Sequence, residues 1–108
     1  MKRPESLLTK TKKVRTGCGI LYITYSLPGQ GYHEVYGLLG KTGGCSACMI
    51  SALTRTITVG WNAGASIEKI IKQLDGSNCP HMSYLDKSCP QAIADVLKET
   101  QIEREEGK

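Results

Sequence analysis

Five cysteines in a chain of 108 residues constrain its fold and chemistry more than any other feature of the sequence. They are Cys18, Cys45, Cys48, Cys79 and Cys89. An odd number fits a framework made only of disulfides poorly. All of them except Cys48 stand at the edges of the elements expected below. Cysteines at such positions indicate metal binding or reactive thiols.

The ends of the chain and its hydropathy bear on where the thiols function. Charge follows Met1 directly, and the apolar pair Leu7-Leu8 is too short for the core of a secretory leader. No stretch approaches the ~20 apolar residues that a membrane span needs. We therefore expect a cytoplasmic protein, in which reduced cysteines serve metals or catalysis rather than disulfides.

The expected elements are two strands followed by three helices. Residues 19–26 are β-branched and aromatic, and residues 32–39 follow a Pro-Gly turn, so the two segments predict a β-hairpin. An apolar stripe over residues 45–61 predicts a helix. Ser66 and Ser88 are suited to cap two further helices at their N-termini. The fold class is therefore α+β, an N-terminal β-hairpin followed by three helices.

The net charge of +4 is unevenly distributed. Residues 1–15 carry six Lys and Arg against one Glu, whereas the remainder has eight basic and nine acidic residues. This pattern predicts a basic flexible arm at residues 1–14, a folded domain at 15–100 and a charged tail at 101–108. The arm is either a solvated tail or a segment that contacts phosphates.

Three interpretations of the cysteines follow from their spacing. A zinc ion would need thiolates that converge tetrahedrally, and glycines and helix N-termini beside several of these cysteines favour that arrangement. Inert buried thiols are the second interpretation. A redox pair is the third, because Cys45 and Cys48 form a CxxC motif that opens a helix. His81 could also replace one cysteine at a metal.

The chain resembles the TSCPD domain family from about Thr16 to Leu97. The resemblance rests on TGCG at 16–19, GKTGGC at 40–45, the helix SIEKIIKQLDG at 66–76, Cys79-Pro80, and SCP at 88–90. The motif that names the family differs here at both ends, with Lys87 in place of Thr and Gln91 in place of Asp. Such domains occur at the C-terminus of adenosylcobalamin-dependent ribonucleotide reductases and as short standalone proteins.

The resemblance implies that four cysteines are shared and form a cysteine-clustered zinc site: Cys18, Cys45, Cys79 and Cys89. Cys48 is then a local addition. The implied function is a standalone, non-catalytic zinc-binding module, accessory to nucleotide metabolism and partnered with a ribonucleotide reductase. We carry no catalytic residue across, and the sequence contains no nucleophile–base pair that would support a hydrolase.

A glycine-rich segment supports an alternative function. The segment Gly40, Lys41, Thr42, Gly43 and Gly44 precedes a helix, where backbone N–H groups can hold an anion. A small protein that sequesters a nucleotide or another phosphate-bearing ligand could use this loop, and a phage-encoded origin would suit it. A homo-oligomer would help it build a deep pocket. The same glycines could instead only permit a tight turn.

Overall fold

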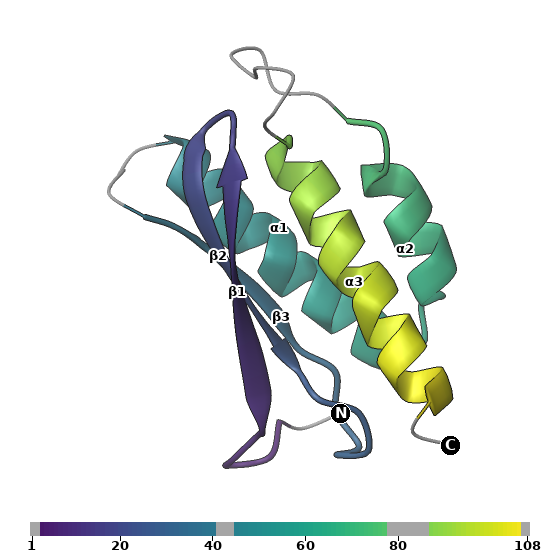
Figure 1. Cartoon of the computed structure of the whole chain (residues 1–108). Coiled ribbons are helices and arrows are strands. Elements are labelled where there is room, and N and C mark those ends of the chain that lie inside the picture. The colour runs from purple at the N-terminus through teal and green to yellow at the C-terminus, as the bar shows by residue number, and fades with distance from the viewer. Residues whose placement is uncertain (1–2, 41–44, 78–86, 107–108) are drawn as a thin grey trace.

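The computed structural model describes residues 3–40, 45–77 and 87–106. Within these ranges the chain forms a three-stranded antiparallel sheet followed by three helices, which confirms the α+β class and the three helices (Figure 1). The strands are β1 (Thr9–Thr16), β2 (Gly19–Ser26) and β3 (Val35–Leu39), in the order β1-β2-β3. The helices are α1 (Cys45–Asn62), α2 (Ile67–Leu74) and α3 (Cys89–Glu106).

The first strand lies where a flexible arm was expected. Residues 9–16 pair with β2 along their whole length, from Thr9 opposite Ser26 to Thr16 opposite Gly19. Sequence reasoning missed this strand because the segment TKTKKVRT has no alternation of apolar and polar residues. An edge strand buries little, and lysine is a common residue on edge strands. The expected hairpin therefore corresponds to β2 and β3 of a three-stranded sheet.

The helices cover one face of the sheet, and the core lies between them. Along β3 the burial alternates strictly, with Val35 and Leu39 buried and Tyr36 and Leu38 exposed. Strand β2 contributes Leu21, Ile23 and Tyr25 to the same buried side. Helices α1 and α3 pack against this side, and α2 packs against α3 (Figure 1). No helix in the described ranges is long and apolar enough to cross a membrane.

Helix α1 is joined to β3 by a row of polar side chains. Thr54 Oγ1 accepts a hydrogen bond from the Gly37 N–H at 3.0 Å. Thr58 Oγ1 accepts from the Val35 N–H at 3.0 Å and donates to the Val35 carbonyl at 2.9 Å. Asn62 makes the same pair of bonds to the main chain of His33. We call Thr54, Thr58 and Asn62 the polar ladder of α1.

The ladder works because two repeat distances nearly coincide. Four residues of a helix advance about 6 Å, and two residues of a strand advance about 6.7 Å. Every fourth residue of α1 can therefore meet every second residue of β3 when the two run antiparallel. The ladder also explains why threonine, a residue of modest helix propensity, lies in the middle of this helix.

Close approach of α1 to β3 requires a glycine at position 37. A Cβ atom there would lie 2.8 Å from Ile50 Cγ2 and 3.3 Å from the methyl group of Thr54. Both neighbours belong to α1, and Thr54 is fully buried. Gly37 thus sets the distance between the helix and the edge of the sheet, which lets the ladder reach the main chain.

Capping and burial test the expectations for the helices. Ser66 caps α2 and accepts a hydrogen bond from the Lys69 N–H, as predicted. The apolar stripe of α1 is narrower than the sequence indicated. Ile50 and Ile57 are buried, but Met49 and Val59 are about two-thirds exposed or more, at 68% and 70%. These two side chains point away from the sheet.

Candidate functional site

The turn between β1 and β2 meets the start of α3 at one end of the sheet. Thr16 forms a parallel bridge with Lys87, and the Gly17 N–H donates to the Lys87 carbonyl at 3.1 Å. Gly19 closes the turn with a φ of 129°, a conformation that favours glycine. The residues that lead into α3 are thereby held against the turn that carries Cys18.

The hydroxyl of Thr16 contacts the main chain of one expected ligand and the thiol of another. It accepts a hydrogen bond from the Cys18 N–H at 3.2 Å and one from the Cys89 thiol at 3.3 Å. It donates to the Gly19 carbonyl at 2.8 Å. Cys89 is buried, and Cys18 is half-buried against the core. Sequence reasoning selected both cysteines but not Thr16, whose signal was only its place in TGCG.

The other two expected ligands are not placed beside this pair. Cys45 begins α1 and is exposed, as is Cys48. Cys79 and His81 lie outside the described residues. Across the described ranges no group of three or more His, Cys, Asp or Glu side chains is close enough to hold a metal ion. The structure therefore makes Cys18 and Cys89 neighbours through the Thr16 hydroxyl, and the proposed set of four ligands stays a prediction.

The start of α1 nevertheless faces the same end of the molecule. The Gly40 N–H donates to the Ile20 carbonyl at 2.9 Å, which places the end of β3 beside the start of β2. The β1–β2 turn and the starts of α1 and α3 all lie at the upper end of the view in Figure 1. The topology thus directs three of the cysteine-bearing segments toward one end of the domain.

Of the expected anion loop, only Gly40 is described. Its N–H bonds Ile20 and so belongs to the sheet, and a Cβ at this position would lie 3.1 Å from Cε2 of Tyr22. Lys41, Thr42, Gly43 and Gly44 lie outside the described residues. Gly40 therefore has a packing role beneath the Tyr22 ring, and anion binding by the loop stays a prediction.

Comparison with known proteins decides the family. A family model described as the TSCPD domain matches residues 1–101. The chain belongs to the TSCPD domain family. No curated protein and no solved structure matches the chain. The resemblance on which the sequence argument rested is thus confirmed over nearly the whole chain.

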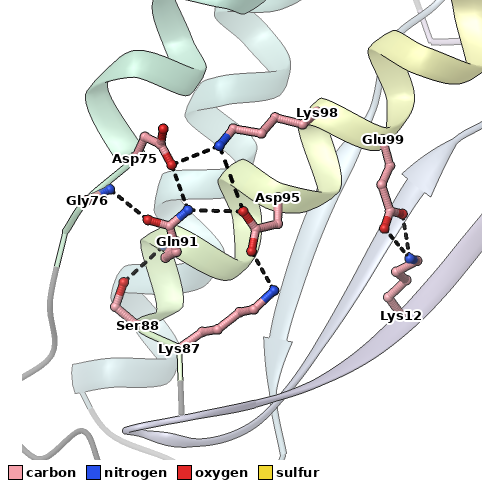
Figure 2. A network of polar contacts seen from close by, with 9 residues as sticks. All are labelled: Lys12, Asp75, Gly76, Lys87, Ser88, Gln91, Asp95, Lys98 and Glu99. Carbon is pink, nitrogen blue, oxygen red and sulfur yellow. Dashed lines mark hydrogen bonds and ion pairs between the residues drawn. The ribbon is translucent and has the colours of Figure 1, made fainter. Parts of the chain in front are cut away.

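This TSCPD protein uses Gln91, one of the two atypical residues of the motif, to join α2 to α3. Ser88 caps α3 by accepting a hydrogen bond from the Gln91 N–H at 3.0 Å. The Gln91 side chain turns toward α2, where its Oε1 accepts from the Gly76 N–H at 2.7 Å. Its Nε2 donates to one carboxylate on each helix, Asp75 at 2.6 Å and Asp95 at 3.0 Å (Figure 2).

Glutamine at position 91 is suited to this place because an amide can donate and accept at once. The family's Asp would offer no donor and would put a third carboxylate beside Asp75 and Asp95. Lys87, the other atypical residue, forms an ion pair with Asp95, and Lys98 lies 3.0 Å from Asp75 (Figure 2). Each end of the motif thus contacts a carboxylate of the network.

These contacts lower the pKa values of both carboxyl groups. Hydrogen bonds from Gln91 and then Lys98 hold the pKa of Asp75 below its ordinary value. Partial burial acts in the opposite direction on Asp95, but hydrogen bonds from Lys87 and Gln91 outweigh it and lower the pKa of Asp95. Both groups are therefore carboxylates at neutral pH, and the network is held together by charge.

Proposed function

We propose that this TSCPD protein is a non-catalytic, zinc-stabilised module that is accessory to nucleotide metabolism and acts in trans on a ribonucleotide reductase. Family membership supports the connection with reductases. The observation that carries the zinc proposal is that the Cys18 main-chain N–H and the Cys89 thiol both contact the buried Thr16 hydroxyl, so these two residues are neighbours. Two chain segments far apart in sequence bring potential ligands to one corner of the fold.

The residues present suit zinc in their chemistry. Thiolates are the ligands that structural zinc sites favour, and a closed site takes four of them. Cys18 and Cys89 would supply two, and Cys45 and Cys79 would supply the others. Bound zinc would tie the β1–β2 turn, the start of α1 and the entry into α3 together. A small domain gains stability from such a cross-link.

The first experiment is native mass spectrometry of the purified protein under reducing conditions, together with thermal unfolding before and after chelation. We expect one zinc per chain and a lower midpoint of unfolding after the metal is removed. The variant Cys79→Ser should lose the metal, since it removes one of the four proposed ligands. If the wild-type protein contains no metal and chelator does not change its midpoint of unfolding, the zinc-site proposal is wrong.

Cys48→Ser is the matched control. Cys48 is exposed on the same helical turn as Cys45 but lies outside the four shared cysteines, so this variant should retain zinc. The spectrum would also reveal a retained nucleotide as additional mass. A nucleotide lost in Lys41→Ala, with the fold intact, would support the sequestering function in place of the accessory one.

Exposure of both thiols favours one second candidate, a thiol redox protein. Cys45 and Cys48 are three residues apart on α1, so their side chains lie on one face of the helix. In that case two thiols would form one disulfide and transfer two electrons and two protons to an oxidant such as another disulfide. A metal-free protein whose mass falls by two hydrogens after mild oxidation would favour this function. Cys48→Ser would then abolish the change.

The accessory role needs a separate test. The reduced, metal-loaded protein is mixed with an adenosylcobalamin-dependent ribonucleotide reductase that lacks a TSCPD domain of its own, and the mixture is analysed by size-exclusion chromatography. We expect the two to elute together. Separate elution, with a reductase activity that the module leaves unchanged, would contradict the accessory role while leaving the zinc site intact.

A further inference from the structure

The outer edge of β1 presents main-chain groups that are free to pair with another strand. In an antiparallel pair, residues point their N–H and C=O groups alternately toward the partner strand and away from it. The Leu27 N–H donates to the Leu8 carbonyl, so even-numbered residues of this segment face β2. Thr9, Thr11 and Lys13 consequently face outward, and within the described residues their main-chain groups have no hydrogen-bond partner.

The opposite edge of the sheet is closed to the same kind of pairing. There the polar ladder of α1 binds the outward N–H and C=O groups of residues 33 and 35 and the outward N–H of residue 37. In the part of the chain that the structure describes, β1 therefore offers the one edge that can accept a strand. Eight residues give it the length for several main-chain bonds.

One end of this edge already pairs in this way. The Lys87 N–H approaches the Arg15 carbonyl at 3.5 Å, and the Gly17 N–H donates to the Lys87 carbonyl, which makes a single parallel bridge at Thr16. Beyond the bridge a hollow follows the edge between β1 and α3. Val14, Ala92 and Val96 give it apolar surface, and the ion pairs Lys87–Asp95 and Lys12–Glu99 lie along it (Figure 2).

Charge selects the occupant of the edge. Four of the eight residues of β1 are basic: Lys10, Lys12, Lys13 and Arg15. A second copy of β1 would bring four more positive charges against them, and like charges in directly opposite positions destabilise a strand pair. Acidic side chains on the added strand would instead lie beside Lys13 and Arg15 on the open side of the sheet, whereas Lys12 on the helical side is already paired with Glu99.

We propose that the outer edge of β1 binds an acidic, extended segment of a partner protein as a fourth strand of the sheet. Main-chain hydrogen bonds to Thr9, Thr11 and Lys13 supply the pairing, and the side chains of Lys13 and Arg15 select for negative charge. This proposal does not depend on zinc, because it rests on the strand edge and not on the cysteines.

A single-stranded nucleic acid is the competing occupant of this basic region, because Tyr22 and Tyr36 lie on the open face of the sheet. Both rings are already engaged, however. Tyr22 packs over Gly40, and the Tyr36 hydroxyl lies 3.4 Å from the Ser51 hydroxyl of α1. They are 37% and 38% exposed, and a stacked base would have to compete with these contacts.

The test uses two acetylated peptides about as long as β1, one alternating glutamate and valine and the other alternating lysine and valine. Each is titrated into the ¹⁵N-labelled protein at low salt. We expect the acidic peptide to bind at least about tenfold more tightly, since charge selects the partner. Its shifts should concentrate on the amides of Thr9, Thr11 and Lys13. Equal affinity, absence of binding at millimolar peptide, or shifts confined to the helices would overturn the proposal.

Two substitutions at position 11 isolate the main-chain contribution. Thr11→Val and Thr11→Pro both lose the hydrogen bond between the Thr11 and Thr24 hydroxyls, but only proline removes the outward N–H. We expect Thr11→Val to bind the acidic peptide like the wild type and Thr11→Pro to bind at least about tenfold more weakly. Because Thr11→Pro could fail to fold, its spectrum is checked first. Lys13→Glu is the second variant, and we expect it to weaken binding of the acidic peptide but not binding of the basic peptide.

A single-stranded oligothymidylate distinguishes the competing occupant. We expect it to leave the amides of β1 unchanged at physiological salt. An oligothymidylate that binds more tightly than the acidic peptide and shifts Tyr22 and Tyr36 would replace the peptide by a nucleic acid and overturn the proposal.

Discussion

Along β3, side chains of α1 hydrogen-bond the main chain of the edge strand. Along β1, helix α3 contributes the ion pair Lys12–Glu99, and Lys87, just before α3, forms one bridge at Thr16. Two members of the ladder are buried: Thr54 is fully buried and Thr58 is 8% exposed. The ion pair between Lys12 and Glu99 is 42% exposed on both side chains. Neutral bonds in a buried place are costly to break, and exposed ion pairs contribute little. The two edges thus differ in how firmly a helix holds them.

The largest expected effect comes from the substitution Gly37→Val, which pushes α1 away from β3. The added carbons would overlap Ile50 and Thr54, so the helix must move and the ladder must lengthen. We expect a loss of about 3 kcal/mol in the free energy of unfolding, measured by urea denaturation. A loss below about 1 kcal/mol would show that α1 is not held as closely as the structure indicates.

Thr58→Val tests the ladder without changing the volume of the side chain. The variant leaves the N–H and C=O of Val35 buried without their partner, so we expect a loss of about 2 kcal/mol in the same assay. Thr56→Val, on the exposed face of the same helix, should cost less than about 0.5 kcal/mol. Thr11→Val on the edge of β1 should cost equally little. Equal losses at positions 58 and 11 would erase the difference between the edges.

Gln91→Asp restores the residue that the family's motif has at this position. It removes the donor to Asp95 and the acceptor for the Gly76 N–H, and it adds a carboxylate to a cluster of two. We expect a loss of about 1 kcal/mol at pH 7, measured by thermal unfolding. Gln91→Glu is the control, because it keeps the length of the side chain but also lacks the donor. An unchanged midpoint in both variants would show that the network does not secure α3.

The smallest expected effect is a difference between the edges in acid. The pKa values of Asp75 and Asp95 are lowered in the folded protein, so their contribution to stability is present above the unfolded value of about 4. It is lost as the pH falls through the still lower folded values. The ladder contains no titrating group. Hydrogen-exchange protection factors, which correct for the slower intrinsic exchange in acid, should therefore fall in α2 and α3 below about pH 4 before they fall in α1. A simultaneous loss of protection would contradict the comparison.

The sequence predicted those parts of the fold in which local chemistry determines structure. Ser66 and Ser88 cap helices as their positions indicated, and residues 19–26 form a strand from their β-branched composition. Strand β1 was missed because its partners, and not its own residues, make it a strand. The role of Thr58 could not be read either, since a threonine in a helix looks the same whether it faces water or the main chain of a neighbouring strand.

Sequence patterns were less complete for the candidate site. The motifs identified Cys18 and Cys89, and in the fold the Cys18 main chain and the Cys89 thiol both contact the Thr16 hydroxyl. The departures from the family's motif at Lys87 and Gln91 were visible, but the carboxylates that make them useful come from α2 and from a later turn of α3. Such a network depends on how two helices cross, which one sequence does not record.

The correspondence between α1 and β3 also restricts how the chain can change in length. An insertion of one residue between Thr54 and Asn62 would turn the rest of the helix by about 100° and carry the later ladder residues off the strand. A deletion of one residue within 33–37 would turn the outward main-chain groups of the strand inward, so they would no longer meet the ladder. Changes in length can therefore accumulate in the segment between β3 and α1 or beyond the helix. A library of single-residue insertions would map the ladder as a stretch where almost none survive.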